Sequence, residues 1–83
     1  MDSPIMVLDL HGLRTEEAKK KIDAALSAAG AGVYRIRLIH GYHRGDAIRR
    51  MIYEEYRFGR EPKVLRVCPG ENEGITELVL REY

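Results

Sequence analysis

The sequence has almost no cysteine and no long apolar run, and each shortage excludes a class of protein. Cys68 is the single cysteine among 83 residues, so an intrachain disulfide and a cysteine-based zinc site are both excluded. No apolar stretch approaches the roughly 20 residues of a membrane-spanning helix, so we expect no membrane partner. The first residues lack the basic and apolar segments of a secretory signal, which predicts a cytoplasmic location.

Internal repeats, linkers and low-complexity segments are absent as well. A length of 83 residues suits one small domain, which we place at residues 1–83. The hydrophobic content of 45% and the charged content of 33% are those of a folded domain rather than a disordered tail. The net charge is only +1, but between residues 35 and 60 seven arginines stand against three acidic residues. This local excess of positive charge suits a polyanion as partner.

Two periodicities alternate along the chain. Apolar residues at every second position predict strands over residues 4–11, 33–39, 63–68 and 75–81. Helical spacing predicts one helix after Thr15, its expected N-cap, up to Gly30, and a second from Gly45 or Asp46 to Gly59. The order β-α-β-α-β-β predicts an α/β two-layer sandwich with both helices on one face of the sheet. The short connection between the last two strands favours an antiparallel relation.

The loop over residues 39–45 carries most of the polar chemistry. Gly41 and Gly45 allow a tight turn or a close approach to a ligand, and the helix that follows offers free N–H groups. His40, His43 and Arg44 add two titratable groups and a fixed cation. The loop therefore suits a phosphate, while the alternative interpretation is a glycine-containing turn with no ligand.

Three titratable side chains stand at the ends of the first two predicted strands: Asp9 and His11 close the first, and His40 closes the second. Since ligands gather at the carboxyl ends of parallel strands, we expect these side chains to meet beside the loop. A histidine there can take a proton from a nucleophile or give one to a leaving oxygen, and a carboxylate can orient it. The alternative role for each histidine is a hydrogen bond that stabilises a turn. A divalent ion such as Mg²⁺ or Mn²⁺ is a weaker hypothesis, because no recognised ligand spacing occurs.

Further candidates for nucleic-acid contact come from the second predicted strand and second predicted helix. Alternation places Arg35 and Arg37 on the sheet face away from the helices. Arg49 and Tyr53 lie one helical turn apart, a mixture of charge and aromatic ring that is typical of nucleic-acid surfaces. The alternative is a solvated helix face with local acidic partners.

Several of these residues carry a resemblance to a known family. The sequence Leu-Asp-Leu-His at residues 8–11, the His-Gly loop about thirty residues later and Gly-Ile-Thr at residues 74–76 are similar to the Smr, or small MutS-related, domain. The resemblance covers nearly the whole chain. It implies a fold like the C-terminal domain of a bacterial translation initiation factor. In that fold the four-stranded mixed sheet has the order 1-2-4-3, with strand 4 antiparallel.

The resemblance also implies a function, since the family is associated with DNA binding and nicking and, in some members, with RNA cleavage. Asp9 and His11 match its first motif. Three residues match its His-Gly-x-Gly-x-Gly loop: His40, Gly41 and Gly45. His43 stands where the family has the middle glycine. We therefore expect a DNA- or RNA-binding domain with endonuclease activity, needing no small-molecule cofactor. A non-catalytic module that binds nucleic acid or protein is the alternative.

Overall fold

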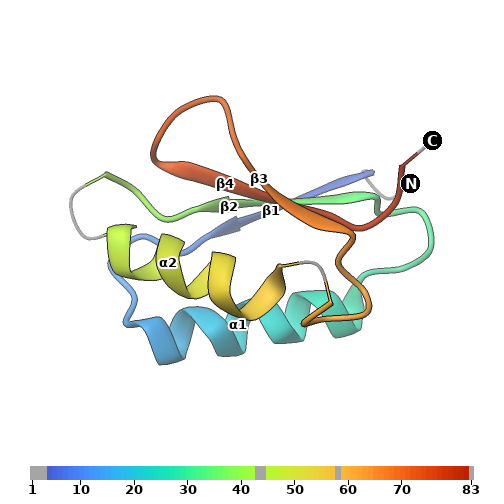
Figure 1. The fold of residues 1–83 in the computed structure, drawn as a ribbon, viewed down its shortest axis with the longest axis horizontal. Helices are drawn as coiled ribbons and strands as arrows, with labels where there is room; N and C mark the ends of the chain where they lie inside the picture. Colours follow the sequence, from blue (N-terminus) through green and yellow to red (C-terminus); the bar gives the residue numbers. More distant parts are fainter. Residues whose placement is uncertain (1–3, 43–44, 58, 83) are drawn as a thin grey trace.

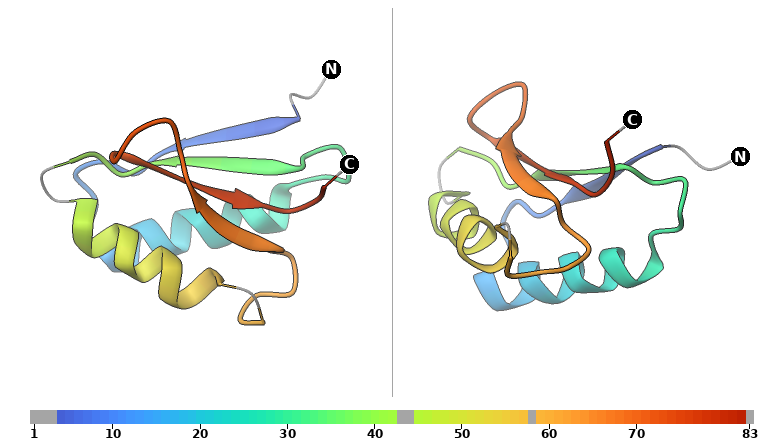
Figure 2. Two further views of the ribbon diagram at one scale, coloured as in Figure 1. Left: turned by 45° about the horizontal axis from the view of Figure 1, so that its top comes forward. Right: turned by 45° about the vertical axis from the view of Figure 1, so that its right-hand side comes forward.

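The computed structural model describes residues 4–42, 45–57 and 59–82, which form one four-stranded sheet and two helices (Figure 1). In chain order the elements are β1 (Ile5–Asp9), α1 (Thr15–Ala28), β2 (Arg35–Ile39), α2 (Gly45–Tyr56), β3 (Arg66–Pro69) and β4 (Ile75–Val79). Both helices pack side by side under one face of the sheet, and the other face is left without a covering helix (Figures 1 and 2). The predicted two-layer α/β architecture is confirmed.

The strand order is β1-β2-β4-β3, as the resemblance implied. β1 and β2 are parallel and in register, with Ile5 beside Arg35 and Asp9 beside Ile39. β4 runs antiparallel to both β2 and β3, so it fills the centre of the sheet between them. The carboxyl ends of β1 and β2 consequently lie at the same edge, where the chain then enters each helix.

The core lies between the helices and the covered sheet face. In β2, Ile36 and Leu38 are completely buried, while the arginines on either side of Ile36 lie on the open face. The helices contribute an apolar stripe each: Ala18, Ile22, Ala25 and Leu26 from α1, and Ile48, Ile52 and Tyr56 from α2. Burying one such large side chain stabilises the fold by about 1.5–3 kcal/mol, so the two stripes fix both helices to the sheet.

Element boundaries differ from the prediction at several points. The predicted N-cap Thr15 is wrong: α1 begins at Thr15, and Arg14 is the extended N-cap residue, whose N–H donates to the Glu17 carboxylate at 3.0 Å. β1 ends at Asp9 rather than residue 11, because the chain turns immediately afterwards through Gly12 at a φ of +79°. β3 starts at residue 66 instead of 63, since the preceding residues form a turn closed by the Val64 N–H and the Glu61 carbonyl.

The two helices are joined by a polar contact as well as by packing. The Tyr56 hydroxyl donates to the Asp23 carboxylate at 2.5 Å, and Lys19 lies 5.1 Å from the centre of the Tyr56 ring. Burial and the Asp23 carboxylate both raise the pKa of Tyr56, so the phenol stays protonated and keeps donating. Neither helix, within the part of the chain that is described, has the length and apolarity needed to cross a membrane.

Candidate nucleic-acid interface

The segment after β1 and the loop after β2 lie against each other. The Leu10 N–H donates to the Ile39 carbonyl at 2.7 Å, which carries the parallel pairing one residue past β1. Gly41 has a φ of +84°, and a Cβ placed on it would lie 3.7 Å from the Cβ of His11. Both predicted motifs therefore meet at one edge of the sheet.

Asp9 and His11 form an exposed hydrogen-bonded pair at that edge. Nδ1 of His11 bonds to the Asp9 carboxylate, and the backbone N–H of His11 donates to the same oxygen at 3.2 Å. The exposed fractions of the two side chains are 58% for Asp9 and 71% for His11. The hydrogen bond from the imidazole, followed by that from the backbone, lowers the pKa of Asp9 below its usual value. The pair is thus a carboxylate-oriented imidazole whose Nε2 has no hydrogen-bond partner among the described residues.

Lys21 adds a cation that the sequence interpretation missed. Its ammonium group donates to the backbone carbonyl of Asp9 at 3.0 Å. The signal was present in the sequence: Lys21 directly precedes the buried Ile22, so it lies at the border of the apolar stripe of α1 and can reach the sheet edge. An exposed positive charge beside the Asp9–His11 pair favours an approaching phosphate.

His40 has a different environment. Its side chain is almost fully buried; Nε2 lies 2.8 Å from the hydroxyl oxygen of Thr76, and Nδ1 lies 3.1 Å from the Gly41 carbonyl. Because a carbonyl only accepts, Nδ1 carries the proton and Nε2 accepts from Thr76. Burial and the positive charge of Arg49 lower the pKa of His40 more than the Gly41 hydrogen bond raises it. The ring is therefore neutral and fully bonded at neutral pH.

The backbone around His40 is fixed by the turn between β3 and β4. The N–H groups of His40 and Gly41 both donate to the Gly74 carbonyl at 3.0 Å. The exposed ring of Tyr42 lies on Gly74, where a Cβ would come within 3.2 Å of a ring carbon. Thr76 and Gly74 are thus two residues that hold the loop. Thr76 could have been noticed as a polar residue at a core-facing position of an apolar strand.

The start of α2 is next to this loop. The helix begins at Gly45, and the Asp46 carboxylate in its first turn accepts from Arg49 at 2.7 Å and Arg50 at 3.0 Å. These arginines pair with Asp46 rather than with the later glutamates of the helix. His43 and Arg44, two of the predicted phosphate contacts, lie outside the described residues.

Arg35 and Arg37 lie apart from the loop, on the open sheet face. Both pair with Glu77 of β4, at 2.5 Å and 2.9 Å respectively. Burial raises the pKa of Glu77, but hydrogen bonds from Arg37 and Arg35 outweigh it and leave the pKa below its usual value. Glu77 is a third residue that the sequence interpretation missed, and it neutralises part of this positive charge.

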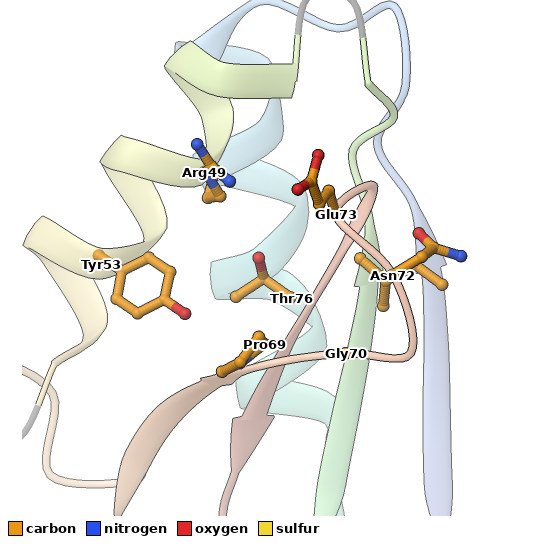
Figure 3. A pocket seen from close by; sticks show the side chains of 8 residues that line it. Arg49, Tyr53, Pro69, Gly70, Asn72, Glu73 and Thr76 are labelled. Carbon is orange, nitrogen blue, oxygen red and sulfur yellow. The ribbon is translucent and has the colours of Figure 1, made fainter.

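Two cavities adjoin the loop and share Arg49 and Glu73 in their walls. The smaller, of about 90 Å³, is lined by His40, Gly41, Tyr42 and Asp46 in addition to the shared pair. The larger, of about 510 Å³, lies between α2 and the β3–β4 turn (Figure 3). Its other lining residues are Tyr53, Pro69, Gly70, Asn72, Ile75 and Thr76. Arg49 and Tyr53, predicted from their helical spacing, therefore share one cavity.

Comparison with known proteins agrees with this geometry. A family model described as the Smr domain matches residues 8–78 of the chain. The chain belongs to the Smr domain family. The crystal structure of the Smr domain of Thermus thermophilus MutS2 is similar to it, with 33% sequence identity and a TM-score of 0.79, over 93% of this chain and 99% of that one. No match was found among curated proteins.

Smr domains are known for nucleic-acid binding and nuclease-related roles. In this Smr domain, the matched span includes the Asp9–His11 pair, the loop after β2 and the Gly74–Thr76 anchor beneath it. Within the described ranges, no three His, Cys, Asp or Glu side chains gather where they could share a metal ion.

Proposed function

We propose that this Smr domain binds DNA or RNA at the edge formed by the Asp9–His11 pair and the loop after β2, and that it cleaves phosphodiester bonds there as an endonuclease. One observation carries the proposal: an imidazole oriented by a carboxylate is exposed beside a glycine loop and a helix start. This combination offers a proton acceptor next to a place where backbone N–H groups and cations can receive a phosphate.

His11 serves as the acid/base in this proposal, and Asp9 as its orienter. Nε2 takes the proton of an attacking hydroxyl, either water or a ribose 2′-OH, while a new P–O bond forms. The P–O bond to the leaving oxygen breaks, and that oxygen receives a proton from the imidazolium or from solvent. Asp9 stabilises the imidazolium that exists between these events, as an ionised carboxylate does for a neighbouring histidine.

The loop and the surrounding cations hold the phosphate. Backbone N–H groups at the start of α2, with the side chains of His43 and Arg44, supply hydrogen bonds and positive charge to its oxygens. Lys21 adds a charge on the other side of the pair. Arg35 and Arg37, held by Glu77 on the open face, contribute to the field that attracts a polyanion rather than to the scissile phosphate.

His40 becomes a positioning residue instead of a second acid/base. Its ring is buried and bonded at both nitrogens, so its work is to fix the loop against β4. This observation also favours the second candidate function, a module that binds nucleic acid without cutting it. Among the described residues of the site, His11 is then the one exposed imidazole that can transfer a proton.

The test compares cleavage and binding in parallel. We expect His11→Ala to lower the rate of plasmid nicking or RNA cleavage by about 10²- to 10⁴-fold, while binding of the same nucleic acid changes little. Asp9→Asn should reduce cleavage less, because the imidazole remains. Lys20→Ala, an exposed neighbour on α1, is the control and should leave cleavage unchanged.

The two candidate functions give different results. Cleavage by neither wild type nor His11→Ala, together with salt-sensitive binding, would support the binding module. Equal cleavage by both proteins would contradict His11 as the acid/base. Phosphate contact predicts that log K falls by about 0.9 per neutralised phosphate for each tenfold rise in salt on duplex DNA. A flat dependence on salt would contradict both functions and indicate a partner other than nucleic acid.

A further inference from the structure

The 510 Å³ cavity between α2 and the β3–β4 turn is large enough for a small ligand, whereas its 90 Å³ neighbour is not. The smaller one has room for a few water molecules. The larger is walled by the exposed ring of Tyr53 on the α2 side and by Pro69 and Gly70 on the turn side (Figure 3). A flat aromatic ligand fits such walls, because it can stack on the tyrosine ring.

The polar groups of the cavity suit a nucleobase better than a phosphate. Glu73 makes no hydrogen bond or ion pair with any described residue, so its carboxylate would repel an anion. Among the described residues of the wall, Arg49 is the one cation, and it is already bonded to Asp46. The Asn72 side-chain oxygen accepts from the Gly74 N–H, which leaves its amide N–H groups as donors. Figure 3 shows the Asn72 amide directed away from Tyr53, so the cavity offers the Glu73 carboxylate as an acceptor without net attraction for phosphate.

From these contacts we infer that the cavity is a subsite for one unpaired nucleobase, with guanine preferred; this inference rests on the proposed function and names its substrate class. Guanine presents two adjacent N–H donors, N1–H and N2–H, to the two oxygens of the Glu73 carboxylate. In a duplex the same edge is occupied by base pairing, so the base must be unpaired. Tyr53 stacks on the base.

The subsite is connected to the Asp9–His11 pair by continuous contacts. Thr76 at the back of the cavity holds His40, and the adjoining Gly41 lies against His11. A nucleotide with its base in the cavity therefore places its phosphate outside, over Arg49 and the start of α2. The scissile phosphate then lies toward the loop, and single-stranded or looped nucleic acid becomes the substrate.

A mononucleotide tests the subsite without requiring cleavage. With guanosine 5′-monophosphate as probe, we expect NMR shifts at Asn72, Glu73 and Thr76 that inorganic phosphate does not cause. Adenosine 5′-monophosphate should bind at least threefold more weakly. Tyr53→Ala should weaken binding about 5- to 100-fold, whereas Tyr53→Phe, which keeps the ring, should weaken it less than threefold. Shifts confined to residues 41–46 would overturn the inference.

Two substitutions that remove a negative charge and keep the side-chain shape test the choice of base. Glu73→Gln should remove the preference for guanine, while Glu71→Gln, an exposed glutamate outside the cavity, should preserve it. Binding of guanosine 5′-monophosphate in the cavity by a protein that cuts no nucleic acid would keep the subsite and overturn the nuclease. Conversely, oligonucleotide cleavage that is unaffected by Tyr53→Ala and Glu73→Gln would overturn the subsite and keep the nuclease. Thermal unfolding of each variant confirms that it is folded.

Discussion

Replacing His40 separates a positioning histidine from a catalytic one. In His40→Ala the imidazole bonds to Thr76 and Gly41 disappear, and the Thr76 hydroxyl, which is 1% exposed, is left without its partner. An unsatisfied buried hydroxyl costs about 1–3 kcal/mol, and loss of the ring's packing adds to it. We expect a total loss of about 2–4 kcal/mol in the free energy of unfolding. For an 83-residue domain with about 4–12 kcal/mol in all, this is a large fraction.

Thr76→Val provides the matched partner for a double-mutant cycle. By itself, Thr76→Val leaves Nε2 of His40 without a hydrogen-bond donor and should lower the free energy of unfolding by about 1–3 kcal/mol. With His40→Leu as the other single change, the double variant His40→Leu/Thr76→Val replaces both polar groups by apolar ones, so it should be more stable than the sum of these two single changes predicts. The coupling energy should be about 0.5–3 kcal/mol, measured by urea unfolding followed by circular dichroism.

The pH dependence supplies a second, independent readout. The pKa of His40 in the fold is below its ordinary value of 6.5. At a pH between the folded pKa and 6.5, the unfolded chain therefore binds more protons than the folded chain does. The stabilisation is complete above pH 6.5 and is lost as the pH falls from there through the folded pKa. The slope from this one group is at most about 1.4 kcal/mol per pH unit. The difference between wild type and His40→Leu/Thr76→Val should therefore shrink in acid.

Unchanged stability in His40→Ala, combined with lost cleavage, would refute this reasoning. That result would mean that the ring acts on the substrate and that its two hydrogen bonds contribute nothing to the fold. If His40→Ala lost both stability and cleavage, and the stable double variant His40→Leu/Thr76→Val recovered cleavage, the result would directly support His40 as a positioning residue.

Three further substitutions test the frame around the site. Tyr56→Phe removes the hydrogen bond between the helices and should cost about 1 kcal/mol in unfolding free energy, with no change in fold by circular dichroism. Gly70→Ala would bring a Cβ within 2.4 Å of the Ile75 side chain, so a thermal melt should show a loss of about 1–3 kcal/mol, whereas Gly32→Ala, in open space, should be near neutral. Glu77→Gln should cost about 1–3 kcal/mol at neutral pH. Because the pKa of Glu77 is lowered in the fold, its ionised carboxylate stabilises the fold above the unfolded pKa of 4.5, and this stabilisation is lost as the pH falls through the folded pKa. The unfolding free energies of wild type and Glu77→Gln should therefore become equal in acid.

Local pattern was sufficient to predict the helices and strands and their order along the chain, because the two kinds of element have different periods. The alternation around Ile36 and Leu38 indicated a strand with one buried face, and the stripe through Ile48 and Ile52 indicated a helix. The order of the strands in the sheet could not be predicted in this way, because alternation does not indicate which strands are neighbours. The strand order was predicted from the resemblance to the family instead. Boundaries such as Arg14 as N-cap depended on single hydrogen bonds, which no periodicity encodes.

The sequence by itself determined which residue types stand near the ends of the first two strands: Asp9 and His11 at the first, and His40 at the second. Only the tertiary structure decided what each histidine can do. His11 lies in solvent and His40 lies under β4, although both lie within two residues of the end of a strand. The partner that separates them is Thr76, which is 36 residues from His40 along the chain and 2.8 Å from it in the fold. A side chain's exposure and hydrogen bonds depend on such distant neighbours, so local sequence pattern cannot assign them.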